Sequence, residues 1–71
     1  WSDELSEMQK NILRLYIRGN SYSAIAQKLF IEQATVKYHM KEMIQKCGFQ
    51  SKQELVAAAI ESTVITSMAE L

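Results

Sequence analysis

The sequence contains few of the residues that interrupt helices or cross-link small folds. It has no proline, two glycines, one cysteine and one histidine among its 71 residues. A single cysteine excludes an internal disulfide, and one cysteine with one histidine is too few for a four-ligand zinc site. No apolar run approaches the ~18 residues of a membrane-spanning helix. The length and these absences predict one small domain without covalent or metal cross-links.

The sequence also lacks the motifs that enzymes use. It has no glycine-rich phosphate loop, no catalytic pair of carboxylates and no metal-ligand spacing. His39 has no Ser and Asp partners that would make it a general base, so we expect a structural role at a helix interface. Cys47 belongs to an apolar stripe, which favours a packed thiol over a redox sensor. We therefore predict no catalytic residue, no metal and no cofactor.

Charge is distributed unevenly along a chain that is neutral overall. Eight Lys and Arg residues balance eight Asp and Glu residues. Residues 28–52 nevertheless hold five Lys and two Glu, a net charge of +3, whereas the remainder has a net charge of −3. A basic middle can present one positive face to a polyanion such as nucleic acid. A solvated surface would have the same pattern, so this feature alone does not decide the function.

Hydrophobic periodicity predicts an all-α domain of four helices. For the first, at about residues 7–18, Ser6 and Gln9 resemble a capping box and Gly19 supplies a left-handed stop. Its expected apolar face comprises Met8, Ile12, Leu15 and Tyr16. The second helix begins after Ser21 as N-cap, and its expected buried stripe comprises Tyr22, Ile25, Ala26 and Leu29.

The third helix follows a short connection and repeats the helical period. Its expected buried face comprises Val36, Met40, Met43, Ile44 and Cys47. Gly48 ends it, and Phe49 is placed to fold back on Ile44. Ser51 and Glu54 form an S-x-x-E capping box for the fourth helix, which continues through the apolar residues 55–60. We expect the helix to fray or end at the β-branched residues 63–66.

Two helices joined by three or four residues are typical of a helix-turn-helix. The second of the pair, here the third helix of the chain, must bury one face and offer the other to the major groove of DNA. At ~100° per residue, the side chains opposite its apolar face are Ala34, Lys37, Tyr38, Lys41 and Gln45, with Thr35 and Glu42 at the margin. Lys, Gln and Tyr can contact base edges, although an ordinary solvated face contains such residues too.

Residues 5–60 resemble the LuxR-type, or GerE-like, DNA-binding domain of bacterial transcription regulators. The residues that carry the resemblance occur in unbroken order: Leu5-Ser6, Gly19, Ser21, Ile25-Ala26, Leu29, Ile31, Thr35-Val36-Lys37, His39, Gly48-Phe49-Gln50-Ser51 and Glu54-Leu55. The resemblance implies a compact four-helix domain containing a helix-turn-helix. Its third helix would be the recognition helix in the major groove, and its fourth helix would contribute to a dimer.

The resemblance also implies roles for single residues. The groove-facing residues would be Lys37, Tyr38 and Lys41. The phosphate backbone would meet Gln33, Thr35, Lys46, Ser51 and Lys52. For the dimer interface on the fourth helix we expect Leu55, Ala58 and Ala59. Four positions depart from the usual family residue. This chain has Tyr22 where the family commonly has Asn, Ala24 where it has Glu, Glu32 where it has Ser, and Cys47 where it has Leu. Glu32 is a poor N-cap and brings a negative charge toward phosphate.

These patterns predict how the chain is divided and what it binds. We expect a linker remnant at residues 1–4, the DNA-binding domain at residues 5–62, and a C-terminal tail at residues 63–71 into which the fourth helix could extend. Because the chain starts at Trp1, we expect an excised part of a longer bacterial regulator. Its partners would be double-stranded DNA, a second copy that pairs through the fourth helix, and an upstream regulatory domain of the same protein. We expect the protein in the cytoplasm and no membrane contact by this segment.

One alternative function stays open at this point. The chain could be a helical protein-interaction or dimerisation module with weakened or lost DNA binding. Overall neutrality, Glu32 and the apolar residues 55–60 favour this alternative. The basic middle of the chain and the pair Lys37 and Lys41 favour sequence-specific DNA binding.

Overall fold

Four α-helices follow a short 3-10 turn in the computed structural model, which describes residues 2–61. The turn is Ser2–Glu4, and the helices are α1 (Glu7–Ile17), α2 (Tyr22–Leu29), α3 (Gln33–Lys46) and α4 (Lys52–Glu61). The described residues contain no strand, which confirms the predicted all-α class. Residues 2–4, expected as part of a linker, form the turn. Trp1 and the expected tail at residues 63–71 lie outside the described residues.

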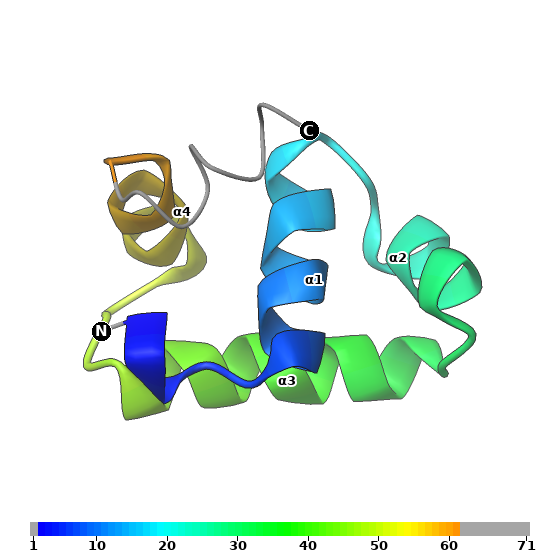
Figure 1. The fold of residues 1–71 in the computed structure, drawn as a ribbon, viewed down its shortest axis with the longest axis horizontal. Coiled ribbons are helices and arrows are strands. Elements are labelled where there is room, and N and C mark those ends of the chain that lie inside the picture. The colour runs from blue at the N-terminus through cyan, green and yellow to red at the C-terminus, as the bar shows by residue number, and fades with distance from the viewer. Residues whose placement is uncertain (1, 62–71) are drawn as a thin grey trace.

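The other three helices pack on α3. In Figure 1, α3 runs along the base, α1 stands nearly upright on it, and α2 and α4 lie on opposite sides of α1. α3 contacts each of α1, α2 and α4, and α1 also contacts α2. Only Phe30, Ile31 and Glu32 separate α2 from α3. The pair therefore forms the predicted helix-turn-helix.

A single hydrophobic core fills the space between the helices of the described part. α3 contributes Val36, Met40 and Met43, and Ile44 and Cys47 pack against the core as partly buried residues. This confirms the predicted face of α3. The other buried apolar residues are Leu5, Ile12, Leu13, Ile25, Ala26, Leu55 and Ala59.

The buried face of α1 differs from the prediction. Its centre consists of Gln9, Ile12 and Leu13, of which none is more than 1% exposed. The predicted Ile12 is fully buried, and the predicted Met8, Leu15 and Tyr16 pack against the core as partly buried residues. The prediction omitted Gln9 and Leu13 from the buried face. Apolar periodicity misses a core glutamine because an amide is buried only where its polar atoms have partners.

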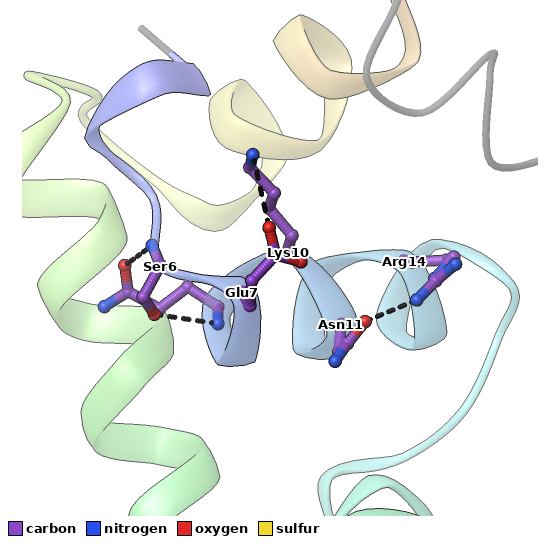
Figure 2. Close-up of polar contacts among 6 residues, drawn as sticks. Ser6, Glu7, Lys10, Asn11 and Arg14 are labelled. Atoms are coloured by element: carbon purple, nitrogen blue, oxygen red, sulfur yellow. Dashed lines mark hydrogen bonds and ion pairs between the residues drawn. The ribbon is translucent and has the colours of Figure 1, made fainter.

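α1 begins at the predicted capping box, which Figure 2 shows around Ser6. The Ser6 hydroxyl accepts a hydrogen bond from the backbone N–H of Gln9 at 3.2 Å, and the Ser6 N–H donates to Gln9 Oε1 at 3.2 Å. Further along α1, Lys10 pairs with Glu7 at 3.9 Å, and the Arg14 guanidinium donates to the Asn11 side chain (Figure 2). This reciprocal pair of hydrogen bonds gives an acceptor to the backbone N–H groups of Ser6 and Gln9, which have none within the helix.

α1, α2 and α3 all end with the same backbone closure. In each, an N–H beyond the helix donates to a carbonyl five residues earlier: Asn20 to Leu15, Ile31 to Ala26, and Phe49 to Ile44, at 3.2, 3.0 and 2.9 Å. This is the Schellman pattern, and it confirms the predicted closure between Phe49 and Ile44. The pattern requires one residue with a positive φ, and Gly19 and Gly48 supply it after α1 and α3.

Phe30 takes the left-handed position after α2, with φ of 58°. A residue with a Cβ atom adopts this conformation at a cost of roughly 1–2 kcal/mol. The Phe30 side chain is 94% exposed, so burial does not offset that cost. The turn of the helix-turn-helix therefore presents a strained aromatic residue at the surface.

The N-terminus of α4 agrees with the predicted capping box in one of its two hydrogen bonds. The Glu54 N–H donates to the Ser51 hydroxyl at 3.3 Å, as predicted. The Glu54 carboxylate accepts instead from the Gln50 N–H at 3.3 Å, one residue before the cap. The carboxylate thus stabilises the loop that joins α3 to α4.

The N-terminus of α3 lacks the side-chain cap that the other helix starts possess. Glu32 occupies the N-cap position and makes no side-chain capping hydrogen bond. We predict that Glu32→Ser stabilises the domain by roughly 0.5–1 kcal/mol, because a Ser hydroxyl can accept from an exposed N–H of the first turn. Urea denaturation followed by circular dichroism measures the difference. Glu32→Ala is the matched control, and equal stability of the Ser and Ala variants would contradict the capping argument.

Candidate nucleic-acid interface

The outer face of α3 carries the side chains that the sequence places opposite the core. Ala34, Lys37, Tyr38, Lys41 and Gln45 are all located there, and we call them the α3 outer face. Tyr38 is 60% exposed although it is a large aromatic residue. Thr35 and Glu42 are half-buried at the margin, as expected. An exposed phenol between two lysines provides hydrogen-bonding groups and positive charge on one side of one helix.

Three of the lysines lie around one shallow depression between α2, α3 and the start of α4. The depression has a volume of about 610 Å³ and includes Lys37 and Lys41 from α3 and Lys52 from α4. Its floor is partly apolar, with Met40, Ile44 and Phe49. The fold thus brings an expected phosphate contact, Lys52, next to two expected groove contacts.

Two tyrosines hold the side chain of Lys52. Its ammonium lies 5.5 Å from the centroid of the Tyr22 ring and 6.0 Å from that of Tyr16. The two rings lie 5.7 Å apart, tilted by 43°. A cation over aromatic faces is attracted by their negative quadrupole. Tyr22, one of the departures from the usual family residue, therefore helps to orient Lys52, a role that the sequence analysis missed.

The remaining expected phosphate contacts lie apart from the depression. Gln33 and Lys46 are exposed at the two ends of α3, which places them roughly 20 Å apart at 1.5 Å per residue. Thr35 and Ser51 are half-buried. The Ser51 hydroxyl already accepts the capping hydrogen bond from Glu54. The structure thus groups Lys37, Lys41 and Lys52 but leaves Lys46 at the far end of the helix.

A chain of hydrogen bonds connects the core to the α3 outer face, and the sequence analysis did not anticipate it. Gln9 Nε2 donates to Glu42 Oε1 at 2.5 Å and lies 3.3 Å from His39 Nδ1. Tyr38 Oη donates to the other Glu42 oxygen at 2.9 Å. Because Gln9 Oε1 accepts from Ser6, the orientation of the Gln9 amide is set, and Nε2 faces α3. A capping box at the start of α1 is thereby connected by hydrogen bonds to the α3 outer face.

These contacts shift the pKa values of two groups in opposite directions. The hydrogen bond from Tyr38, followed by the one from Gln9, lowers the pKa of Glu42. The same bond and the charge of Glu42 raise the pKa of Tyr38, which further favours the protonated phenol. Since the carboxyl pKa is lower in the folded chain, ionised Glu42 favours folding at neutral pH. That contribution is lost as the pH falls through the lowered pKa.

The single histidine and the single cysteine have structural surroundings. His39 is half-buried on the side of α3 that faces α1. It lies next to the Gln9 amide and edge-on to the Tyr38 ring. Cys47 is half-buried at the end of α3, and burial raises the pKa of its thiol. A raised pKa disfavours the reactive thiolate. Both placements agree with the structural roles expected from the sequence.

α4 presents a different surface from the one expected for a dimer. Leu55 and Ala59, two of the three residues expected at a dimer interface, are fully buried in the domain's own core. Ala58 is half-buried. Ala57 and Ile60 are exposed, and with Val56 they line a groove of about 380 Å³ beside Tyr16. We call Val56, Ala57 and Ile60 the α4 apolar face.

Two other kinds of site are absent from the described part of the chain. Within residues 2–61 there is no group of three or more His, Cys, Asp or Glu side chains placed to hold a metal ion. In the same part of the chain, no helix has the length and hydropathy needed to cross a membrane.

Comparison with known proteins places this sequence in a family. Residues 3–59 match the family model described as bacterial regulatory proteins, luxR family. Among curated proteins, the oxygen regulatory protein NreC of Staphylococcus aureus strains JH9 and NCTC 8325 is 36% identical over 61 residues. The match covers 86% of this chain and 28% of NreC, so the chain spans little more than a quarter of that relative. No solved structure matches significantly.

The buried Gln9 amide makes a prediction about stability. We expect Gln9→Leu to lower the free energy of unfolding by roughly 1–3 kcal/mol, because similar volume is kept while Glu42 loses one of its two hydrogen bonds and the Ser6 N–H loses its acceptor. Thermal or urea unfolding measures the effect. Gln27→Leu, at an exposed position of α2, is the matched control and should change stability by no more than about 0.5 kcal/mol. A Gln9→Leu variant as stable as the parent would show that the hydrogen bonds contribute little.

Proposed function

The chain belongs to the LuxR family of bacterial regulatory proteins, and we propose that it binds double-stranded DNA sequence-specifically through α3. The family is one of DNA-binding regulators and not of enzymes. The observation that carries the proposal is the two-sided character of α3. One side is buried through Val36, Met40 and Met43, and the opposite side exposes Lys37, Tyr38 and Lys41.

In the proposed complex, α3 lies in the major groove as the second helix of the helix-turn-helix. Lys37, Tyr38 and Lys41 contact base edges, because Lys bonds to guanine acceptors and Tyr can bond to or pack on base edges. Gln33, Thr35, Lys46, Ser51 and Lys52 contact the phosphate backbone, which positions the domain without reading sequence. The depression shared by Lys37, Lys41 and Lys52 supports this division, since it places positive charge beside the groove-facing residues.

The chain acts, in this proposal, as the DNA-binding part of a longer transcription regulator in the bacterial cytoplasm. Its match to little more than a quarter of NreC supports an additional regulatory domain in the same protein. We further propose that two copies pair through the α4 apolar face. Two-fold pairing would place two recognition helices about one turn of DNA apart on a pseudo-palindromic site.

A protein-interaction module without DNA binding is the second candidate function. The α4 apolar face favours it, because exposed Ala57 and Ile60 fit a partner helix with or without DNA. Glu32 also favours it, since it places a negative charge at the N-terminus of α3. DNA binding requires the outer face of α3, whereas a protein-interaction module requires only the α4 apolar face. Variants on the two helices therefore distinguish the two functions.

We predict that the lysines of α3 and α4 affect DNA binding in different ways. Lys37→Ala or Lys41→Ala should weaken binding to a selected sequence and relax preference at one base pair, by about 1–3 kcal/mol for a base-reading contact. Lys52→Ala should weaken binding to all sequences alike. It should also reduce the slope of log affinity against log salt concentration by about the amount of one phosphate contact. Fluorescence anisotropy over a range of salt concentrations, with selected and random duplexes, measures both effects.

Lys10→Ala is the matched control for loss of one positive charge, because Lys10 lies on α1 and pairs with Glu7. It should change DNA binding least of the four variants. Equal losses on selected and random duplexes for all three interface lysines would reject the groove assignment. An affinity that does not change with salt would reject the proposed phosphate contacts. No binding to any duplex at low salt would reject DNA binding itself and favour the interaction module.

Pairing through α4 is tested by a charge on its apolar face. We predict that Ala57→Glu weakens binding to a duplex with two half-sites at least several-fold more than binding to one half-site, because the charge would be desolvated between two copies. Gln27→Glu adds the same charge at an exposed position of α2 and is the control. Sedimentation of the parent at high concentration should show self-association. A strictly monomeric parent, with equal effects on the two duplexes, would contradict pairing.

A further inference from the structure

The hydroxyl of Tyr38 has one hydrogen, and that hydrogen is already used. Tyr38 Oη donates to Glu42 Oε2 at 2.9 Å, one turn along the exposed side of α3. A phenol has one donor and can accept through the lone pairs of its oxygen. While the bond to Glu42 persists, Tyr38 therefore meets any further partner only as a hydrogen-bond acceptor.

Glu42 cannot easily turn away from Tyr38, because its other oxygen is held from the core. Gln9 Nε2 donates to Glu42 Oε1 at 2.5 Å, and Gln9 itself is 1% exposed. The Gln9 amide is oriented by the Ser6 N–H on its oxygen side. Both hydrogen bonds also favour the ionised form of Glu42, which accepts from Tyr38 and has no proton to donate.

The site where Tyr38 would meet a ligand is a small hollow on the outer side of α3. Its volume is about 260 Å³, and it is lined by Tyr38, Lys41, Glu42 and Gln45. Lys41 and Gln45 bring donor groups to the same hollow. Because the hydroxyl hydrogen of Tyr38 is bound to Glu42, its oxygen can only accept a hydrogen bond in this hollow, whereas the two neighbouring residues can donate.

We propose that Tyr38 reads DNA as a hydrogen-bond acceptor and selects a base with an exocyclic amino group in the major groove, cytosine or adenine. Cytosine N4 and adenine N6 are the amino donors that the major groove presents, whereas guanine O6 and N7 and thymine O4 are acceptors that would face the Tyr38 lone pairs without a hydrogen. Glu42 and Gln9 are positioning residues that act through Tyr38. This inference rests on the proposed function.

Glu42→Gln provides a test because it reverses the hydrogen bond instead of removing it. The carbonyl oxygen of the introduced amide can still accept from Gln9, which turns the NH₂ group of that amide toward Tyr38. The NH₂ group then donates to the phenol oxygen, and the phenol hydrogen becomes available to guanine or thymine acceptors. The base preference at one position should therefore change from cytosine or adenine toward guanine or thymine.

The experiment selects binding sequences for the 71-residue chain from a randomised duplex library and compares the parent with Glu42→Gln, Tyr38→Phe and the double variant. We expect the parent to prefer an amino-bearing base at one position by roughly two- to tenfold, the range of one hydrogen bond. Tyr38→Phe should abolish that preference and leave the other positions unchanged. The double variant should resemble Tyr38→Phe, because Glu42 acts only through the phenol.

Glu32→Gln is the control for the removed negative charge. Glu32 is exposed, stands near the start of the same helix, and makes no side-chain capping bond. The substitution should raise affinity for all sequences without changing any base preference. Circular dichroism confirms that each variant is folded before selection.

The outcomes separate this inference from the function on which it rests. If the parent selects no sequence, the proposed function fails and this inference fails with it. If the parent selects a sequence but Tyr38→Phe leaves every position unchanged, DNA binding stands and the role of Tyr38 is overturned. If Tyr38→Phe removes a preference that Glu42→Gln does not change, the acceptor assignment through Glu42 is overturned.

Discussion

Burial of Val36, Met40 and Met43 against α1, α2 and α4 is the interaction on which the rest of the structure depends. These side chains hold one side of α3 in the core, so helical geometry turns Lys37, Tyr38 and Lys41 to the solvent. α3 is therefore at once the support for the other three helices and the element with the exposed basic side. Loss of packing beneath it would also remove the surface that we propose for DNA.

Local sequence signals predicted most of this arrangement. Caps at Ser6, Ser21 and Ser51 act within three residues, and Gly19 and Gly48 supply positive φ where the helices end. On α3, the spacing of the apolar residues is sufficient to separate the core side from the outer side. Such signals suffice because each depends on neighbours within one or two helical turns. The resemblance to a family then supplied the expected roles that spacing could not.

The features that escaped the sequence analysis depend on contacts between distant parts of the chain. Gln9 was identified as a capping residue, but its bond to Glu42 spans 33 residues and requires the crossing of α1 over α3. The tyrosines beside Lys52 come from α1 and α2 and meet only in the folded domain. On α4, periodicity could not tell which apolar residues enter the core, because apolar residues occur on more than one side. Leu55 and Ala59 turned out to be inside.

The repeated closure at the ends of α1, α2 and α3 has a consequence for how quickly the domain forms. Each closure reverses the chain through hydrogen bonds between residues five apart, so successive helices are directed toward one another by local contacts. Small helical domains with mostly local contacts fold within microseconds to milliseconds, because little loop entropy is lost before contacts form. During synthesis at about 5–20 residues per second, a segment of this kind would reach its folded form as soon as it left the ribosome, before any domain made after it.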